Sequence, residues 1–369
     1  MEEKTALVYS PEIKNYSFGQ NHPFASDRFE IFLNFFEKRF AKFKDRFVKI
    51  KPKPANDEVL KLVHDKEYIE TLKKASEGKI LPNIHQYVSG DNLNPSTGYI
   101  PKGIEEGAKI CVGTSLLAGE LVVKEEYKKA IGIGGGLHHA KSSYGEGFCF
   151  YNDIAVLAKS LKQKYDLKKI LILDTDAHAG NGVEEIFYDD SEVLFIDFHQ
   201  YSFGFYPGTG KIEEIGAGKG KGLTVNLPLA PGTGYDAYRY LFEKIVFPLV
   251  KEFQPKIMIR YGGSDPHYLD GLTDLGLSLD GFLMIGREVR ELAKEVCQEK
   301  EVDLLASGYN QRVLPYAWSA LIAGLLDLDI DLGDLKERTP PARNVRYKEA
   351  KDVARELKKY LKKYWRCMK

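Results

Sequence analysis

Short apolar runs alternate with longer amphipathic segments along most of this chain, and no other sequence feature constrains the fold as strongly. The runs are rich in β-branched residues, and segments with apolar residues at helical spacing follow most of them. Strands of a parallel sheet read as continuous apolar runs because helices bury both faces of the sheet. The alternation therefore predicts an α/β fold with an open, mainly parallel sheet and helices on both faces.

Each expected element can be placed on the sequence. The expected strands are Ala6–Tyr9, Ala130–Ile133, Ile170–Leu173, Val193–Ile196, Leu223–Leu227, Ile257–Tyr261 and Val302–Ala306. The expected helices are Ala25–Arg39, Gly103–Leu121, Asp153–Gln163, Tyr235–Phe253, Gly281–Gln298 and Leu314–Leu326, with a shorter one over Gly180–Tyr188. No repeat or low-complexity linker interrupts this order, so we expect a single domain over residues 1–369. The glycine-rich stretch Gly204–Gly222 predicts a long surface loop.

The last stretch, Tyr347–Lys369, is lysine-rich. Its apolar residues Val353, Leu357, Leu361 and Trp365 recur at four-residue spacing, which predicts a basic C-terminal helix docked by one apolar stripe. An arm that contacts a nucleic acid or another partner is the alternative. Against that alternative, 53 basic and 53 acidic residues give the whole chain a net charge of zero, so no nucleic-acid partner is expected.

The sequence offers no membrane segment and no cysteine framework. It contains no apolar run of about 18 residues and no basic leader followed by an apolar stretch, so we expect a soluble, cytoplasmic protein. Its cysteines are scattered rather than paired, so any metal must use other ligands. They are Cys111, Cys149, Cys297 and Cys367.

Four of the expected strands end directly in residues that can perform acid–base or metal chemistry. The carboxyl ends of parallel strands face one crevice, where open α/β sheets bind their ligands. The four clusters are therefore expected to meet there. They are His138 and His139; Asp174, Asp176 and His178; Asp265; and Tyr309.

The cluster after the expected strand Ile170–Leu173 is the densest. Asp174, Asp176 and His178 alternate, so an extended backbone would project their side chains to the same side. The alternative is a helix-cap or turn residue before Gly180–Tyr188. Three polar groups in five residues after a fully apolar run favour metal binding or catalysis instead. For Asp265, which precedes a proline, a structural turn is the competing interpretation.

The histidine pair and the tyrosine gain their interest from position. His138 and His139 follow three glycines in a chain with eight histidines, and glycine lets backbone approach a ligand closely. Two histidines in the core or on a loop remain the alternative. Tyr309 is one of 22 tyrosines, and only its place after a strand and Gly308 makes it a candidate.

Several ordered motifs resemble those of the histone deacetylase-like family, which includes acetoin-utilisation proteins and acetylpolyamine amidohydrolases. The resemblance spans nearly the whole chain. It implies an arginase/deacetylase-like α/β fold with one catalytic zinc, whose ligands fall at Asp176, His178 and Asp265. Because this donor set is rich in oxygen, iron(II) or another divalent ion would also fit. The motifs are Asn21-His22-Pro23 with Arg28, Val63–Ile69, Gly136–His139, Gly147–Cys149, Tyr151–Asp153 and Phe205–Gly210.

The resemblance also implies roles for the residues around the metal. Asp174 falls behind His138, and Asn181 falls behind His139 where the family usually has an aspartate. A neutral amide does not raise the pKa of an imidazole as a carboxylate does, so we expect His139 to be the general base and His138 the charged stabiliser. Tyr309 is expected to donate a hydrogen bond to the developing oxyanion.

Two further sets follow from the resemblance. Phe148 and Tyr206, with Gly147, match the walls of a narrow acyl-lysine channel, although ordinary core packing is their alternative. Asp91 is a candidate substrate contact. The family's structural potassium, bound partly through backbone oxygens, would use positions Asp174, Asp176, His178, Asp197 and Phe198.

These expectations converge on removal of an acetyl or other acyl group from acetyl-lysine, a polyamine or another small N-acetyl amine. An arginase- or agmatinase-like ureohydrolase with two manganese ions is the alternative enzyme. It would need further carboxylates at positions 180 and 267, where this chain has Gly180 and His267. A non-catalytic acetyl-group sensor or scaffold is the alternative from outside the enzymes. The sequence leaves the oligomeric state open.

Overall fold

The described residues form one eight-stranded parallel sheet. The structure is a computed structural model and describes residues 4–333, 335 and 339–369. The strands lie in the order β2-β1-β3-β8-β7-β4-β5-β6, and every pairing is parallel. Their bounds are β1 Thr5–Val8, β2 Phe47–Ile50, β3 Lys129–Ile133, β4 Ile170–Asp174, β5 Val193–Gln200, β6 Thr224–Leu229, β7 Ile257–Gly262 and β8 Glu301–Leu305.

Seven of these strands coincide with the expected runs, and two differences have physical causes. The unexpected strand β2 lies at an edge of the sheet, where its residues are only partly buried and an apolar run is not required. Strand β5 continues four residues beyond the expected end at Ile196. Polar residues Asp197, His199 and Gln200 are fully or almost fully buried there. A strand that carries buried polar groups toward a site loses its apolar pattern before it ends.

The helices also follow the expected order. Their bounds are α1 Arg28–Arg39, α2 Asp57–Leu60, α3 Lys66–Ser76, α4 Ile104–Val123, α5 Asp153–Tyr165, α6 Asn181–Phe187, α7 Tyr235–Leu241, α8 Phe247–Phe253, α9 Leu279–Cys297, α10 Leu314–Leu326 and α11 Tyr347–Leu361. The single helix expected over Tyr235–Phe253 is instead α7 and α8 joined by a π-helical turn, Phe242–Val246. Pro248 at the start of α8 has no amide hydrogen to donate to the preceding turn, which favours such a break.

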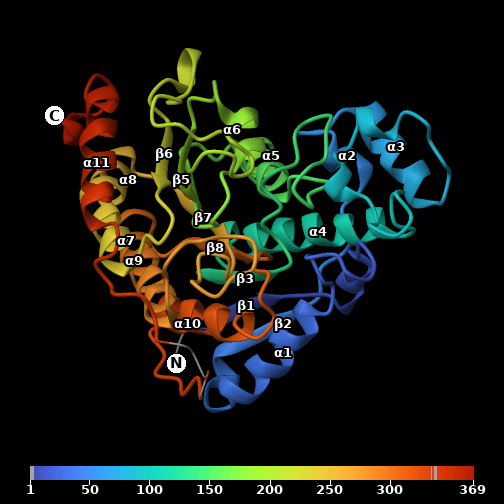
Figure 1. The fold of residues 1–369 in the computed structure, drawn as a ribbon, viewed down its shortest axis with the longest axis horizontal. Coiled ribbons are helices and arrows are strands. Elements are labelled where there is room, and N and C mark those ends of the chain that lie inside the picture. Colours follow the sequence, from blue (N-terminus) through green and yellow to red (C-terminus); the bar gives the residue numbers. More distant parts are fainter. Residues whose placement is uncertain (1–3, 334, 336–338) are drawn as a thin grey trace.

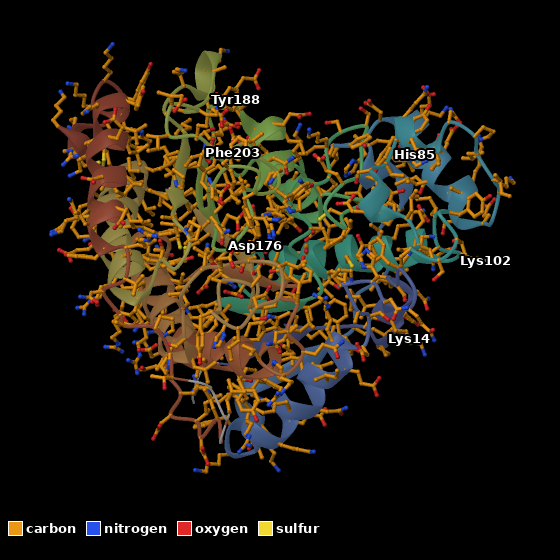
Figure 2. All side chains as sticks on the ribbon, viewed as in Figure 1. Lys14, His85, Lys102, Asp176, Tyr188 and Phe203 are labelled. Carbon is orange, nitrogen blue, oxygen red and sulfur yellow. The ribbon has the colours of Figure 1, made fainter. Side chains whose placement is uncertain are left out.

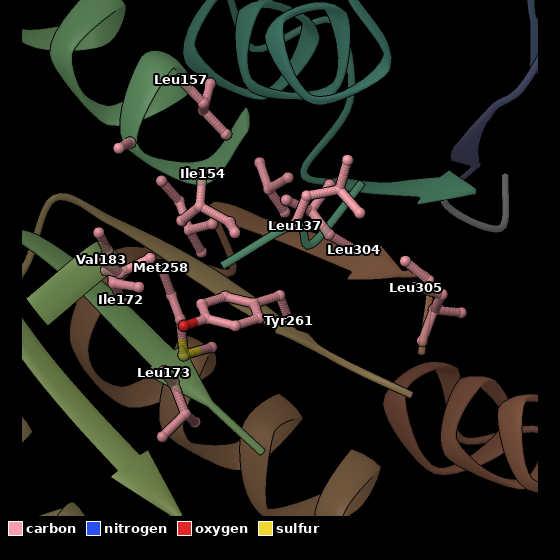
Figure 3. Close-up of a cluster of buried hydrophobic side chains, with 14 of the residues drawn as sticks. Leu137, Ile154, Leu157, Ile172, Leu173, Val183, Met258, Tyr261, Leu304 and Leu305 are labelled. Atoms are coloured by element: carbon pink, nitrogen blue, oxygen red, sulfur yellow. The ribbon is translucent and has the colours of Figure 1, made fainter. Parts of the chain in front are cut away.

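Helices cover both faces of the sheet, which confirms the expected fold class (Figure 1). Helices α4 and α5 lie on one side of the central strands, and helices from the C-terminal half lie on the other (Figure 3). Ile172 and Leu173, neighbours on β4, point to opposite faces and are both fully buried (Figure 3). This two-sided burial is the reason that the strands read as unbroken apolar runs.

The C-terminal segment packs as a helix against α7 and β6. Helix α11 buries Ala350, Ala354, Leu357 and Leu361. Beyond its end, Trp365 is 8% exposed, and its indole Nε1 donates to the carbonyl of Gly222 at 2.7 Å. An apolar stripe thus docks this basic segment. Elsewhere, the stretch 204–222 is a loop with one short helical turn at Gly218–Gly220. Within the described residues, no helix is long and apolar enough to cross a membrane.

Candidate active site

Four neighbouring strands at the centre of the sheet carry the candidate residues. Strands β3, β8, β7 and β4 are adjacent in that order, and the loops after them hold the histidine pair, Tyr309, Asp265 and the Asp174–His178 segment, respectively. The chain separates these loops by up to 171 residues, from His138 to Tyr309. Parallel pairing brings them together at one edge, and Asp176 lies deep inside the molecule (Figure 2).

The segment after β4 is folded by its own carboxylates. Asp174 is the last residue of the strand, and its Oδ1 accepts a hydrogen bond from the Asp176 amide at 2.8 Å. Oδ1 of Asp176 in turn accepts from the His178 amide at 2.8 Å. The backbone bends here, so the extended conformation that we expected is wrong. The three side chains lie close together because each aspartate carboxylate accepts a hydrogen bond from the backbone amide two residues further along the chain. The residue that caps α6 is Gly180, so neither aspartate caps that helix, but both aspartates do act as turn residues.

Asp176, His178 and Asp265 form a buried group that could hold a metal ion. One ligand atom from each lies within 4.8 Å of the others. Nδ1 of His178 is 3.1 Å from Oδ1 of Asp176 and 3.2 Å from Oδ2 of Asp265. Burial lowers the pKa of His178, but the two carboxylates outweigh it and raise the pKa to about 10. Burial and the charge of Asp176 raise the pKa of Asp265 to about 8. These carboxylates converge on one nitrogen, and the group is built to hold positive charge.

Two further side chains, Arg260 and Ser307, hold this group in position through hydrogen bonds to Thr175 and Asp265. Arg260 on β7 donates to Oγ1 of Thr175 from both Nε and Nη2, at 3.0 and 2.6 Å, and pairs with Asp303 on β8 at 3.0 Å. Ser307 donates to Oδ1 of Asp265 at 2.9 Å, which leaves Oδ2 directed toward His178. Sequence reasoning did not identify these residues. The signal available was a buried-strand arginine, which rarely occurs without a buried acid.

The histidine pair faces the same group. Nδ1 of His138 is 2.8 Å from Oδ2 of Asp174, and Nδ1 of His139 is 2.8 Å from Oδ1 of Asn181. The two Nε2 atoms lie 3.1 Å apart, within hydrogen-bond distance, so no more than one of them carries a hydrogen. With both Nδ1 atoms protonated, the pair therefore carries at most one positive charge.

The surroundings place that charge on His138. Burial lowers its pKa, but the charges of Asp174 and Asp176 and the hydrogen bond to Asp174 raise it to about 9. For His139, burial and the neighbouring positive charges of His138 and His178 hold the pKa well below the ordinary value. These pKa directions favour a charged His138 and a neutral His139, and the catalytic roles of the two residues stay predictions.

The start of α5 positions the histidine loop. The Asp153 carboxylate accepts hydrogen bonds from the amides of Gly136 and Leu137 at 2.9 and 2.7 Å. The Asn152 side chain caps α5 and donates to the carbonyl oxygens of His138 and Ala140 at 3.2 and 2.9 Å. The Tyr151–Asp153 motif therefore acts through the backbone of the glycine-rich loop, a role that its sequence did not indicate.

Tyr309 packs near His178 of this group. Its ring is 6.2 Å from the His178 ring and 5.8 Å from the Phe148 ring, measured between centroids. Its amide donates to the Asp270 carboxylate at 2.7 Å, which fixes the loop. Burial and the charges of Asp176 and Asp265 raise the pKa of Tyr309 well above its ordinary value. The phenol therefore keeps its proton and is a hydrogen-bond donor at neutral pH.

Aromatic rings lie close to the residues of this group. The Tyr206 ring is 5.0 Å from the His139 ring, and it is 37% exposed. Phe148 is partly buried next to Tyr309. A Cβ at Gly147 would lie 2.2 Å from the His139 ring, so only glycine lets this loop pass so close. Phe205, which we did not single out, stacks on His178 with centroids 5.3 Å apart and planes at 11°.

Asp91 lies next to the loop that contains Gly147. Its Oδ2 accepts a hydrogen bond from the Gly147 amide at 3.0 Å, and its carbonyl oxygen is 3.0 Å from Nε2 of His22. Burial raises the pKa of this partly exposed carboxyl group. The structure thus gives Asp91 a contact with the Gly147 loop, and its expected contact with substrate stays a prediction.

The expected potassium positions surround the back of the group. Oδ2 of Asp197 accepts from the Gly180 amide at 2.9 Å, and its Oδ1 is 3.1 Å from Nδ1 of His199. Phe198 points away and stacks on Tyr238 with centroids 5.3 Å apart, so only its backbone could face an ion. Burial and the charge of Asp197 raise the pKa of Asp174 to about 7, and potassium binding at these positions stays a prediction.

The fold is of the α/β class, and comparison with known proteins specifies the family. The family model described as the histone deacetylase domain matches residues 22–325. A probable deacetylase of Archaeoglobus fulgidus is 32% identical over 99% of this chain and 99% of its own length. The acetoin utilization protein AcuC of Bacillus subtilis is 33% identical over 88% of this chain and 83% of its own length.

Solved structures agree. The crystal structure of the HDA15 HD domain superposes with a TM-score of 0.83 at 25% identity, covering 100% of this chain and 97% of that one. The chain belongs to the histone deacetylase domain family, as its motifs indicated. It is accordingly a deacetylase, an enzyme that removes acyl groups by hydrolysis.

Proposed function

We propose that this protein is a zinc-dependent deacetylase that cleaves the amide of acetyl-lysine or of a small N-acetyl amine such as an acetylated polyamine. The observation that carries the proposal is the buried Asp176, His178 and Asp265 group, with ligand atoms within 4.8 Å of one another and a histidine pair and Tyr309 facing it. The family supplies the reaction class, and the geometry supports the roles proposed for individual residues.

The donor set fits one divalent ion. Two carboxylates surround Nδ1 of His178, and a metal ion would replace the proton that those carboxylates otherwise hold on the nitrogen. Three protein ligands leave a position open, as in catalytic zinc sites. The chemistry that a bound ion supplies is polarisation of the acetyl carbonyl and a lowered pKa for the attacking water. Zinc is our choice, and the oxygen-rich set would also accept iron(II).

The histidine pair moves the proton. Nδ1 of His139 donates to the Asn181 carbonyl oxygen, so its Nε2 takes the proton from water as the water oxygen attacks the acetyl carbon. The same proton can then pass to the amine nitrogen as the C–N bond breaks, which yields acetate and a free amine. His138, held charged by Asp174, stabilises the negative charge that develops between these steps.

Tyr309 completes the oxyanion site. Its phenol retains its proton at neutral pH, and its ring lies near that of His178. A hydrogen bond from this hydroxyl to the carbonyl oxygen strengthens as that oxygen becomes negative, and such a contact lowers the barrier rather than only binding substrate.

The aromatic walls favour a substrate with an aliphatic stem. Phe148 and Tyr206 flank the approach, and flat rings can enclose a methylene chain without hydrogen-bonding demands. The zero net charge gives no broad acidic surface for a basic protein tail. We therefore place acetyl-lysine and small acetylated amines together as the substrate class. Asp91, beside Gly147, is proposed as a contact for the substrate backbone or amine.

A structural potassium ion behind the metal is the secondary part of this proposal. Asp174 and Asp197 are buried carboxylates close to each other, and burial together with the charge of Asp197 raises the pKa of Asp174. Exchange of potassium for a bulky organic cation should lower the unfolding temperature or the activity. Indifference of both would remove potassium from the proposal.

The binuclear manganese alternative gains no support. Position 180 is glycine, and His267 stacks on Tyr268 and Phe282 with centroids 4.7 and 6.1 Å apart. Within the part of the chain that the structure describes, the only group of three or more potential ligands is Asp176, His178 and Asp265. A second metal would lack its bridging carboxylates.

The proposal is tested by assaying the zinc-loaded protein against acetylated peptides, acetylated polyamines and small N-acetyl amides. We expect acetate release from at least one of these classes, loss of that activity with a chelator, and its return with zinc. Activity that a chelator leaves intact would contradict the metal mechanism. Release of urea from guanidino substrates, with two equivalents of manganese bound, would favour the ureohydrolase.

A further inference from the structure

Glu146 is a carboxylate next to the histidine pair that the proposed mechanism does not use. Its side chain is 16% exposed, and its Oε1 accepts a hydrogen bond from Nδ2 of Asn181 at 2.8 Å. On the other side of the same amide, Oδ1 of Asn181 is 2.8 Å from Nδ1 of His139. Glu146, Asn181 and His139 therefore form one hydrogen-bonded chain that ends at the proposed general base.

Donor and acceptor chemistry gives this chain a direction. A carboxylate oxygen can only accept, so the amide NH2 of Asn181 must face Glu146 and its carbonyl oxygen must face His139. The carbonyl oxygen can also only accept, so Nδ1 of His139 must carry the hydrogen. The lone pair of the neutral imidazole is then on Nε2, the atom that faces the reaction.

Asn181 alone would not secure this tautomer. An asparagine amide can turn by half a rotation and present its NH2 to the histidine, which would move the imidazole hydrogen to Nε2. An aspartate at this position would have no such ambiguity, since both of its oxygens accept. The asparagine in this chain therefore needs a second residue to fix it.

We propose that Glu146 is this positioning residue: it holds the Asn181 amide in one orientation and so keeps Nε2 of His139 free to accept a proton. The inference rests on the proposed function, in which His139 is the base. It gives this deacetylase an asparagine–glutamate pair that does the orienting work a single aspartate would do.

The local fold holds Glu146 in place. Its carbonyl oxygen accepts from the Cys149 amide at 2.9 Å in a tight turn. The following amide, of Gly147, is held by Asp91 at 3.0 Å. Lys141 places its Nζ 3.3 Å from Oε1 of Glu146 and 3.6 Å from the carboxylate of Glu185. Glu185 lies on the same helix as Asn181 but is 57% exposed, which makes it a matched control.

The kinetic test combines single and double substitutions in the zinc-loaded enzyme. We expect Glu146→Ala to lower kcat by about 10- to 100-fold with little change in KM, because the amide loses its fixed orientation. Asn181→Asp should also lose activity, since it opposes two carboxylates that now lie in hydrogen-bond contact. The double variant should be more active than Asn181→Asp alone, because the lone aspartate orients His139 and no longer opposes a second carboxylate. Glu185→Ala should leave kcat unchanged.

A spectroscopic test needs no substrate and separates this inference from the proposed function. Imidazole nitrogen chemical shifts of zinc-loaded wild-type protein should show the His139 hydrogen on Nδ1, and Glu146→Ala should shift the population toward Nε2. An unchanged tautomer in Glu146→Ala, or a double variant whose losses simply multiply, would overturn the role of Glu146. Absence of hydrolysis by the wild type on every acyl amide would instead overturn the proposed function, whatever the tautomer.

Discussion

The edge of the sheet formed by the amino ends of the strands and the edge formed by their carboxyl ends bury charge in opposite ways. At the amino-terminal edge, Lys129 at the start of β3 pairs in register with Glu301 at the start of β8, with charged atoms 3.3 Å apart. At the carboxyl-terminal edge, carboxylates of Asp176 and Asp265 both approach the single imidazole of His178, and Asp174 lies behind them. The first edge matches a cation to an anion, whereas the second gathers more acids than the protein itself neutralises.

This difference separates structure from chemistry. A buried ion pair is satisfied within the protein, so its loss is felt mainly as loss of stability. A buried group with excess carboxylates is costly until it binds a cation from solution, which is the usual reason for keeping one. Substitutions at the first edge should therefore reduce the free energy of unfolding and spare kcat. Substitutions at the second edge should lower kcat and leave the free energy of unfolding unchanged or higher.

The largest effect should come from the proposed base. His139→Ala is expected to lower kcat by about 10²- to 10⁴-fold, because Nε2 of His139 takes the water proton in the proposed mechanism. The unfolding temperature should change little, since the ring faces the site. Steady-state assays on the best substrate of the panel measure the first quantity and calorimetry the second. Near-wild-type turnover would assign the base to another residue.

The next effect tests the opposite edge. Lys129→Met leaves Glu301 buried without its partner and should destabilise the protein by about 3 kcal/mol. Burial already raises the pKa of Glu301 to about 7, so protonation limits the loss. Lys251→Met, which breaks an exposed pair with Glu295, is the control and should cost about 0–1 kcal/mol. Urea unfolding gives both values. A fall in kcat for Lys129→Met would break the separation between the edges.

Removal of one hydroxyl group should lower kcat less than removal of the base. Tyr309→Phe is expected to lower kcat by about 10²- to 10³-fold, the range for loss of one oxyanion donor. Tyr316→Phe, on α10 beside Phe35, removes an equivalent hydroxyl outside the site and should be neutral. Comparable kcat values for the two variants would show that Tyr309 does not contact the oxyanion.

The smallest effect concerns pH. His138 acts in its charged form and has a pKa of about 9, so kcat/KM should fall as pH rises through about 9 and His138 loses its proton. Asp174→Asn removes the charge that raises this pKa, so the fall should begin at lower pH. At neutral pH the variant should lose about 10- to 100-fold in activity. An alkaline limb at the same pH in both proteins would mean that it reports another group.

Much of the fold could be predicted because its signals are local. Strands β3, β4, β7 and β8 are fully buried, and each expected run lies within one residue of the observed strand. The edge strand β2 escaped because partial burial demands no continuous apolar run. Helix α3 was also missed, although apolar residues at positions 68, 69, 72 and 75 are spaced for a helix. That signal was present in the sequence.

The site divides in the same way. Residues that touch the reacting groups follow strand ends and carry distinctive chemistry, so position and residue type were enough to suggest them. Residues that orient them, such as Glu146, Asp153 and Ser307, act through hydrogen bonds across 35, 16 or 42 positions of sequence. Ordinary polar residues on loops carry no sequence mark of such contacts, so only the three-dimensional structure identifies them.

The central claim is that the excess carboxylates at the carboxyl edge hold one metal ion that the reaction requires. The most direct measurement is metal content and deacetylation determined on the same sample of wild-type protein and of Asp265→Asn. We predict about one equivalent of zinc in the active wild type. The variant should lose both metal and activity while its metal-free form unfolds at the same temperature or higher, since burial and the charge of Asp176 disfavour the ionised carboxylate that the substitution removes. Full activity in protein without metal, or an Asp265→Asn variant that keeps both metal and activity, would contradict the account.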